Sequence, residues 1–515
     1  MSNNLAQRTI KNSLYGFISY LWPIAFTIFV TPFVIHKLGI ANYGLYVLML
    51  IIAGFFSLLN FGLVYALVRH LAGLREQGTA EEKEHLSKLY GATIFIFFLI
   101  GILAILVAIL LAHFGLDWFN INVAQRATVE VLFYFVGAIA FFNSMGMVFS
   151  HIPYALQRQD IGTNIYIANI TVLNLLIIGA LSAGFGLIAL VVLQAFSALL
   201  ALLANFYYSR RLMPDLCANY SFDKKIFKEM FSFGGYVYLH NISSSFLSQI
   251  DRIIISSFLG PAAVTFYSVP NSVAEKTQGV IVSLTGVLFP VTAELAKEGD
   301  RERIRRVYHR AMQMIALLAS ALTMTIIVLA KKVLLIWVGP EIASTSTRLL
   351  YWLTPTYFLL ALFLPTTHFL TGIGRAKFLA FSSLAMAILN ILLLFVLLPV
   401  YGITGAAAAY LFSLAPLFYI FYHIEKYFLD ETYVFRLYGK LFLKLIVTAI
   451  PFYIFGSLLV LPMVNNLLAL LLAGGFLSIV YVGLYKIFGF FSPEEWTLFK
   501  GFLKSMFLRL KFLKA

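Results

Sequence analysis

Cysteine and charged residues are scarce in this sequence. The single cysteine, Cys217, excludes an internal disulfide and a cysteine-cluster metal site. Only 11% of the 515 residues are charged and 61% are hydrophobic, more apolar side chains than one soluble core could hide. No nucleotide-binding glycine-rich loop, pair of catalytic carboxylates or Ser-His-Asp set is discernible. We therefore expect no direct use of ATP, no catalytic residues and no metal site.

Long apolar segments take up most of the chain. Each runs for about 20 residues or more, the length with which an α-helix crosses about 30 Å of hydrocarbon while satisfying its own backbone hydrogen bonds. We therefore expect an all-α polytopic membrane protein with 14 transmembrane helices. The predicted spans are residues 13–35, 43–68, 86–112, 127–149, 162–183, 187–208, 231–258, 262–291, 311–338, 347–370, 378–398, 403–422, 441–461 and 467–486. No cleavage site follows the first span, which we expect to be retained as a signal anchor.

The 37 Lys and Arg residues are unevenly distributed over the connections between spans. Nearly all fall on the side of the amino terminus, and the exceptions outside the spans are Lys37, Arg126, Lys331, Lys332 and Arg348. By the positive-inside rule, both termini should be cytoplasmic, with the spans in the plasma (inner) membrane. This placement explains the net charge of +15. It indicates anionic membrane lipids as the counter-charge and no nucleic-acid partner.

Two short sequence patterns recur at equivalent points of the hydropathy profile. Leu38-Gly39-Ile40-Ala41, after the first span, matches Leu259-Gly260-Pro261-Ala262, after the seventh. Phe185-Gly186, after span five, matches Tyr401-Gly402, after span eleven. The repeats predict two six-helix lobes of the same orientation. The predicted parts are an N-terminal lobe (1–210), a C-terminal lobe (211–430), two additional transmembrane helices (431–490) and an amphipathic interfacial tail (491–515).

Polar and ionisable side chains enter the spans mainly in two successive helices. In span seven, Asn241, Ser245, Ser248 and Arg252 fall on one helical face, next to Asp251. Ionisable groups at bilayer depth are costly unless they face a wet cavity or a partner. We therefore interpret this face as one wall of a hydrated cavity.

Span eight carries a second polar stripe, formed by Tyr267, Asn271, Glu275 and Gln278, with Lys276 beside it. Two facing stripes would enclose a hydrated gap. The alternative is structural, with each carboxylate paired to a cation so that the charges only hold the second lobe together. At the cytoplasmic mouth of the first lobe lies Arg69.

The two intramembrane cations, Arg252 and Lys276, are candidates for binding an anionic headgroup such as a pyrophosphate. Arg offers a planar fork of donors and Lys a point charge. Asp251 and Glu275 would orient these cations or bind a coupling ion, H⁺ or Na⁺. We expect no other cofactor.

The segment from Leu38 to Tyr46, Leu-Gly-Ile-Ala-Asn-Tyr-Gly-Leu-Tyr, resembles the LG-x-x-x-YG-x-Y signature that opens bacterial and archaeal polysaccharide flippases. Asp251-Arg252-Ile253-Ile254-Ile255 is similar to the mid-chain segment of that family, and the resemblance covers essentially the whole chain. These flippases are the O-antigen and capsule repeat-unit transporters of the multidrug/oligosaccharidyl-lipid/polysaccharide exporter superfamily. Thr265-Phe266 stands where the second repeat would keep the Tyr43-Gly44 pair.

The resemblance implies two lobes around a cavity walled largely by spans one, two, seven and eight. It also implies movement of a polyprenyl-pyrophosphate-linked oligosaccharide from the cytoplasmic to the outer leaflet by alternating access. Arg252 and Lys276 match the cations that meet the pyrophosphate in such proteins. We further expect a monomer that works with other polysaccharide-assembly proteins. The first span has no deep Arg or Lys, unlike that of lipid-II-type flippases.

Two other functions remain open. A multidrug or cation antiporter on the same fold would be favoured by deep carboxylates in the first span, and none is present. A membrane-embedded polysaccharide polymerase or glycosyltransferase would need catalytic groups in a long external loop, whereas the predicted outer connections are short.

Overall fold

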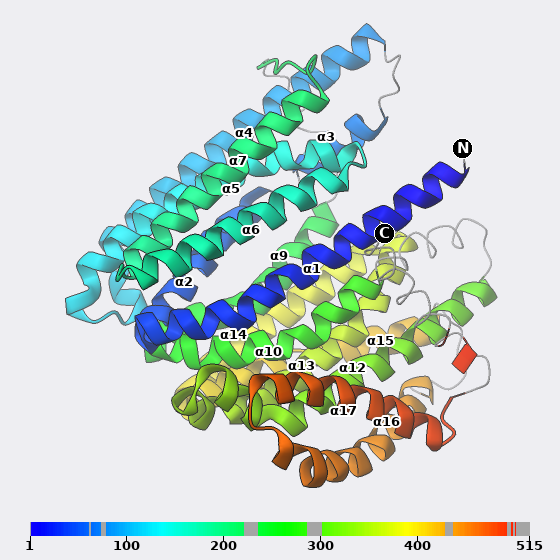
Figure 1. Cartoon of the computed structure of the whole chain (residues 1–515). Coiled ribbons are helices and arrows are strands. Elements are labelled where there is room, and N and C mark those ends of the chain that lie inside the picture. The colour runs from blue at the N-terminus through cyan, green and yellow to red at the C-terminus, as the bar shows by residue number, and fades with distance from the viewer. Residues whose placement is uncertain are drawn as a thin grey trace. The chain divides into compact units, whose positions relative to one another are not determined.

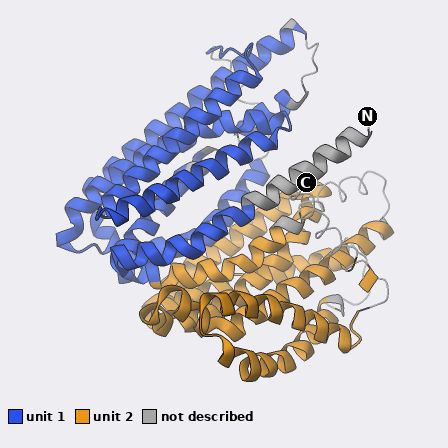
Figure 2. Ribbon diagram, viewed as in Figure 1, with its two compact units in different colours: residues 1–265 blue, residues 266–515 orange. Residues whose placement is uncertain are grey.

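The computed structural model describes residues 2–60, 63–73, 79–220, 235–285, 301–427, 436–491, 496–497 and 500. The described chain is helical (Figure 1), and the described part of each predicted span falls mainly on helix, which confirms the all-α membrane fold class. The chain divides into two compact units, residues 1–265 and 266–515, coloured separately in Figure 2. The predicted interfacial tail lies almost wholly outside the described residues.

Unit 1 comprises the first half of the chain. Its α-helices are α1 (Ser2–Leu38), α2 (Ile40–Phe56), α3 (Leu63–Gly73), α4 (Ala80–Phe114), α5 (Arg126–Ala155), α6 (Gln159–Ser182), α7 (Leu187–Leu212) and α9 (Gly235–Leu259). Short 3₁₀ turns, η1 (Ser57–Asn60), η2 (Leu116–Phe119) and η3 (Val123–Gln125), connect some of them. The helix α10 (Pro261–Thr285) begins in unit 1 and continues in unit 2.

Unit 2 contains the rest of α10 and the remaining helices. These are α12 (Arg301–Val338), α13 (Pro340–Gly372), α14 (Ala376–Phe412), α15 (Pro416–Tyr427), α16 (Arg436–Phe455) and α17 (Leu467–Ile487). A π-helical turn, η4 (Gly456–Val460), and a 3₁₀ turn, η5 (Leu461–Met463), follow α16. Predicted span eleven and the start of span twelve merge in α14, which is broken at Gly402 by a φ of 59°.

Each unit is organised around one or two long helices. In unit 1, α5 packs against α4 and α7, while α6 lies between α1 and α7 (Figure 1). In unit 2, α12 packs against α13, α16 and α17. Fully buried side chains such as Leu48, Phe133 and Val136 fill the centre of unit 1. Since lipid is as apolar as these side chains, close packing rather than exclusion of water holds the helices together.

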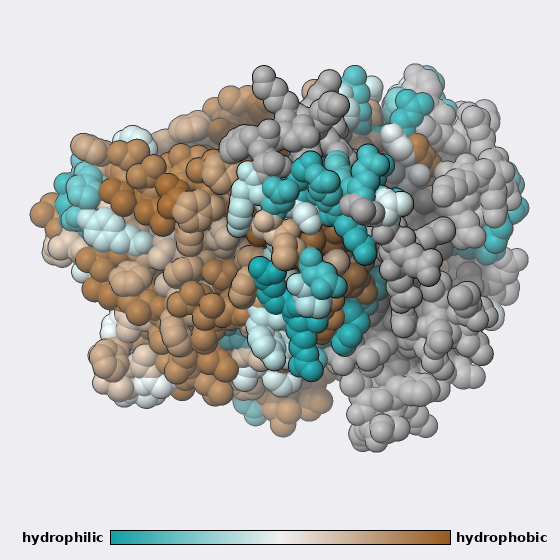
Figure 3. All heavy atoms as spheres, turned by 90° about the horizontal axis from the view of Figure 1, so that it is seen from above, coloured by the Kyte–Doolittle hydropathy of each residue, from teal (hydrophilic) through white to brown (hydrophobic). Residues whose placement is uncertain are grey.

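Hydrophobic side chains also cover the outside of the helices. The exposed apolar side chains of α4 recur along its length: Phe98, Leu99, Ile102, Leu103, Leu106, Ile109 and Leu110. On the face drawn in Figure 3, such side chains form a broad brown belt with hydrophilic residues gathered beside it. In water this surface would drive aggregation, whereas in a bilayer it faces hydrocarbon. Ten stretches of the described chain are long and apolar enough to span a membrane.

The turns after α1 and after α9 share one conformation. Gly39 and Gly260, which occupy equivalent places in the first sequence repeat, both have a φ of 78°. Residues with a Cβ rarely adopt this left-handed backbone conformation, whereas glycine adopts it readily. Each glycine can therefore end one helix and allow the next helix to begin one residue later. The Leu-Gly pair therefore recurs at two turns that both need glycine at the same backbone conformation.

The first turn of α10 packs directly on α2. A Cβ at Gly44 would lie 1.9 Å from the carbonyl oxygen of Pro261 and 2.9 Å from Oγ1 of Thr265. The Thr265 hydroxyl also donates a hydrogen bond of 2.6 Å to the carbonyl of Ile40. The Thr265 side chain thus contacts α2 at both Gly44 and Ile40. A glycine at position 265 would lack the hydroxyl that makes the hydrogen bond to Ile40, so the second repeat has a structural reason to differ from the Tyr-Gly pair here.

Pro270 lies inside α10 and removes one of its backbone hydrogen bonds. Proline has no N–H to donate to the carbonyl of the residue four positions earlier, which here is Phe266. The buried hydroxyl of Ser346, from α13, donates to that carbonyl at 2.7 Å. A carbonyl that would otherwise be unsatisfied in an apolar environment is therefore paired by a neighbouring helix.

Replacement of Gly44 by Val should destabilise the protein by about 1–3 kcal/mol, because the α2 and α10 backbones must separate to admit the side chain. Gly179→Val is the matched control, since a Cβ at Gly179 meets nothing within 4 Å. The free energy of unfolding can be measured by titrating dodecylmaltoside micelles with sodium dodecyl sulfate. Equal losses in the two variants would contradict the close contact.

Ser346→Ala should cost about 1–2 kcal/mol, because it leaves the buried carbonyl of Phe266 without a donor. In a Pro270→Ala background the restored N–H can satisfy the same carbonyl, so the cost of Ser346→Ala should fall to a few tenths of a kcal/mol. The same unfolding titration on the four proteins of this double-mutant cycle gives the coupling. Additive effects would show that Ser346 does not compensate for the proline.

Candidate functional site

The polar face of α9 is only partly exposed. Asn241 is exposed, while Ser245 and Ser248 are half-buried. The Ser248 hydroxyl donates to the carbonyl of Ser245 at 3.2 Å. The face therefore changes along the helix from an accessible amide towards buried charge, because Asp251 and Arg252 are both buried.

Asp251 and Arg252 form an ion pair inside unit 1. Asp251 is 0% exposed and Arg252 is 8% exposed. The Arg252 guanidinium donates to Oδ1 of Asp251 at 3.3 Å and also to the carbonyl of Ser248. The backbone N–H of Arg252 donates to the same carboxylate oxygen at 2.8 Å. Adjacent helical residues do not normally face each other, so this contact requires the long arginine side chain to fold back over the preceding turn.

Burial decides what this pair contributes. Removing two charges from water is costly, and their attraction offsets that cost only if further hydrogen bonds satisfy them. The Ser248 carbonyl and the Arg252 N–H supply such bonds. The arrangement agrees with both sequence-based interpretations of Asp251, as a structural partner of a cation and as the group that orients Arg252.

The polar stripe of α10 combines one buried amide with charged and polar side chains that are exposed or half-buried. Asn271 is 1% exposed, and its Oδ1 accepts a hydrogen bond of 3.1 Å from the hydroxyl of Tyr357 in α13. Glu275 is exposed, and Lys276 and Gln278 are half-buried. Within the described part of the chain, no hydrogen bond or ion pair holds the ammonium group of Lys276.

The predicted site residues therefore belong to two environments. Asp251, Arg252 and Ser248 are brought together in α9, within unit 1. Glu275, Lys276 and the buried Asn271 lie on the part of α10 that belongs to unit 2. Arg69 is exposed in the second half of α3 (Leu63–Gly73). The assignment of these residues to substrate binding and coupling stays a prediction.

A buried carboxylate in unit 2 was not among the predicted site residues. Glu425, in α15, is 0% exposed and interacts electrostatically with the tyrosines Tyr308 and Tyr438. The Tyr308 hydroxyl in turn shares hydrogen bonds with Tyr438 at 2.7 Å and with Thr366 at 2.9 Å. The predicted span twelve ends at residue 422, so Glu425 falls in a predicted solvated connection. An ionisable group buried in a membrane-spanning fold is a candidate for a functional role.

Solved structures share this arrangement of helices. A lipid II flippase, MurJ, in an inward closed conformation aligns with a TM-score of 0.66 and 15% identity, over 92% of this chain and 98% of that one. An inward-facing multidrug-resistance MATE transporter of the MOP superfamily aligns with a TM-score of 0.62 and 16% identity, over 79% and 94%. The fold and the polar groups within its spans thus define a multi-pass α-helical membrane protein of the MATE and MurJ fold.

Sequence comparison narrows the class. The family model described as "Polysaccharide biosynthesis protein" matches residues 5–296, and the MatE model matches residues 237–396. The chain therefore belongs to the polysaccharide biosynthesis protein family, which confirms the resemblance seen in the Leu38 to Tyr46 segment. A putative O-antigen transporter from Shigella flexneri is 23% identical over 417 residues, which cover 78% of this chain and 94% of that protein.

Asp251→Asn should destabilise the protein by about 3–5 kcal/mol, because it leaves the Arg252 charge buried without its partner. Asp117→Asn is the matched control: Asp117 pairs with Arg126, but their side chains are 71% and 44% exposed. That change should cost no more than about 1 kcal/mol. Detergent unfolding titrations measure both, and equally small losses would contradict a buried pair.

Proposed function

We propose that this protein is a flippase that moves a polyprenyl-pyrophosphate-linked oligosaccharide from the cytoplasmic to the outer leaflet. The observation that supports this most directly is the family match over residues 5–296 together with the similarity to an O-antigen transporter along 94% of that protein's length. The likeness to a lipid II flippase supports the fold that such a movement would use. The distribution of Lys and Arg favours cytoplasmic termini and the inner membrane.

The two intramembrane cations would have different roles in this function. Lys276 is half-buried, and no described contact holds its ammonium group, so it is the better placed to meet an anionic headgroup. Arg252 already binds Asp251 and the carbonyl of Ser248. A pyrophosphate would have to compete with these partners, so we assign Arg252 a role that depends on its release from Asp251.

Alternating access is the mechanism that we propose. A charged, sugar-bearing headgroup cannot cross hydrocarbon without a large desolvation cost, so it must remain in a hydrated path while the polyprenyl tail stays in lipid. A coupling ion, H⁺ or Na⁺, would bind at a buried carboxylate, for which Asp251 and Glu425 are candidates by their burial. Glu275 is exposed and remains a predicted partner of Lys276. We also propose that the protein works as a monomer and catalyses no reaction.

A second function, drug or cation antiport, is favoured by the MatE match over residues 237–396. A cation exporter needs a buried carboxylate to bind its cargo or its coupling ion. Among the described residues of α1 to α7, no Asp or Glu side chain is buried. The buried carboxylates Asp251 and Glu425 lie outside these helices, so α1 to α7 lack the buried carboxylate that a cation exporter would use there.

Lys276→Gln should reduce glycan export by about tenfold or more without loss of folding stability. A hydrogen bond to a charged group contributes about 1.5–3 kcal/mol, and each 1.4 kcal/mol corresponds to a factor of ten. The measurement is made in a strain that lacks its own lipid-linked oligosaccharide flippase. Mass spectrometry quantifies the accumulated lipid-linked intermediate, and surface glycan is assayed in parallel.

Lys331→Gln in α12 is the matched control, because Lys331 is an exposed lysine on the predicted outer side. It should leave export unchanged. Arg252→Gln should lower both export and stability, which separates its role from that of Lys276. Normal export in the Lys276 variant, or energy-dependent efflux of a cationic dye by the wild type without glycan export, would overturn the proposed flippase function.

A further inference from the structure

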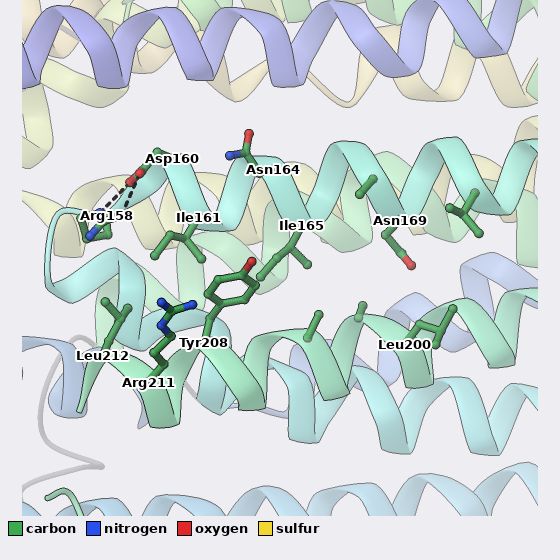
Figure 4. Close-up of a pocket in the computed structure, with 14 residues that line it drawn as sticks. Arg158, Asp160, Ile161, Asn164, Ile165, Asn169, Leu200, Tyr208, Arg211 and Leu212 are labelled. Atoms are coloured by element: carbon green, nitrogen blue, oxygen red, sulfur yellow. Dashed lines mark hydrogen bonds and ion pairs between the residues drawn. The ribbon is translucent and has the colours of Figure 1, made fainter. Parts of the chain in front are cut away.

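A groove runs between α6 and α7, two neighbouring helices of unit 1. Its volume is about 880 Å³. In Figure 4, Ile161 and Ile165 of α6 point towards α7, while Tyr208 and Arg211 of α7 point towards α6. The groove is therefore enclosed by two neighbouring helices of a single unit.

Small side chains keep this groove open. Ala168 on α6 and Ala201 and Ala204 on α7 line it, and their side chains end at Cβ. Farther from the arginines, Val172 and Leu200 extend the apolar lining and are themselves exposed. From Ile161 to Val172 the helix rises about 16 Å, roughly half of the 30 Å hydrocarbon thickness. This stretch also carries Asn164 and Asn169, so the groove is mainly but not wholly apolar there, and the stretch has the length of one leaflet.

The two ends of the groove differ in charge. Arg158 immediately precedes α6, and Arg211 is in the last turn of α7, so both lie at the same end of their spans. Arg158 donates two hydrogen bonds of 3.0 Å to Asp160, which raise the pKa of its guanidinium and neutralise much of its charge. Within the described part of the chain, no hydrogen bond or ion pair holds Arg211. Among the described residues, Arg211 is therefore the cation without such a partner at this end of the mainly apolar groove.

This combination defines a ligand with an anionic head and a hydrocarbon tail. A phosphate would bind the Arg211 guanidinium through charge-assisted hydrogen bonds, and the Tyr208 hydroxyl lines the same end of the groove. An acyl chain would cover the isoleucine, leucine and alanine side chains that a soluble anion would leave bare. The α6 helix also starts without a side-chain cap, and its positive dipole end favours a nearby anion.

We propose that the groove between α6 and α7 binds one anionic glycerophospholipid, with its phosphate on Arg211 and one acyl chain along the groove. The proposal does not depend on the flippase function, because none of the residues that line the groove is among the predicted transport residues. The bound lipid belongs to the leaflet at the arginine end, which the charge distribution predicts to be cytoplasmic. It would fill the space between the two helices and hold unit 1 in register with that leaflet.

Native mass spectrometry of the full-length protein, delipidated in neutral detergent, tests this proposal. Dioleoylphosphatidylglycerol should bind the wild type about tenfold more tightly than dioleoylphosphatidylcholine. Arg211→Ala should remove this preference. Arg210→Gln is the matched control, because the neighbouring Arg210 donates instead to the carbonyl of Leu216 at 3.0 Å and does not line the groove. It should leave phosphatidylglycerol binding unchanged.

Two further experiments distinguish the contribution of the lipid headgroup from that of the acyl chain. Ala204→Phe should fill the groove and abolish tight phosphatidylglycerol binding even though Arg211 is retained. Glycerol 3-phosphate at millimolar concentration should not displace the phospholipid, because it has no acyl chain. Equal phosphatidylglycerol binding in wild type and Arg211→Ala, or full displacement by glycerol 3-phosphate, would overturn the proposal. All variants must elute as monodisperse peaks in size-exclusion chromatography.

Discussion

The contact between Asp251 and Arg252 is the interaction on which the functional interpretation of this protein depends. A carboxylate that is fully buried in a transmembrane helix is tolerated only because a guanidinium and a backbone N–H neutralise and solvate it. The same contact limits what Arg252 can do, since a cation that satisfies an internal partner is not available to a ligand. Any substrate that engages Arg252 must therefore separate a pair that the fold itself stabilises. Lys276, which is half-buried and without such a described partner, carries no equivalent restraint.

The number and position of the helices were predictable because the bilayer imposes a fixed length of apolar sequence on each span. The Leu-Gly turns were predictable too, and Gly39 and Gly260 share a φ of 78°. The second sequence repeat does not have this property: Gly186 has a φ of −101° and Gly402 a φ of 59°. A dipeptide match indicates a shared turn only where the backbone conformation demands glycine.

The environment of the charged side chains could not be predicted from spacing. The helical periodicity of α9 predicts the direction of the Cα–Cβ bond of Arg252. It does not predict the side-chain rotamer, and in the structure the long side chain folds back to the carbonyl of Ser248. The burial of Glu425 depends on helices that lie far away in the chain, α12 and α16. The groove depends on three alanines, and alanine is common in membrane helices for many reasons.

The helix α10 passes from one unit into the other without leaving helical conformation, and Pro270 lies just beyond the crossing. The hydroxyl of Ser346 supplies the Phe266 carbonyl with the hydrogen bond that Pro270 cannot donate. Because α10 has no backbone hydrogen bond between Pro270 and Phe266 to lose, bending of the helix at this point would cost less than bending elsewhere along it, even inside hydrocarbon.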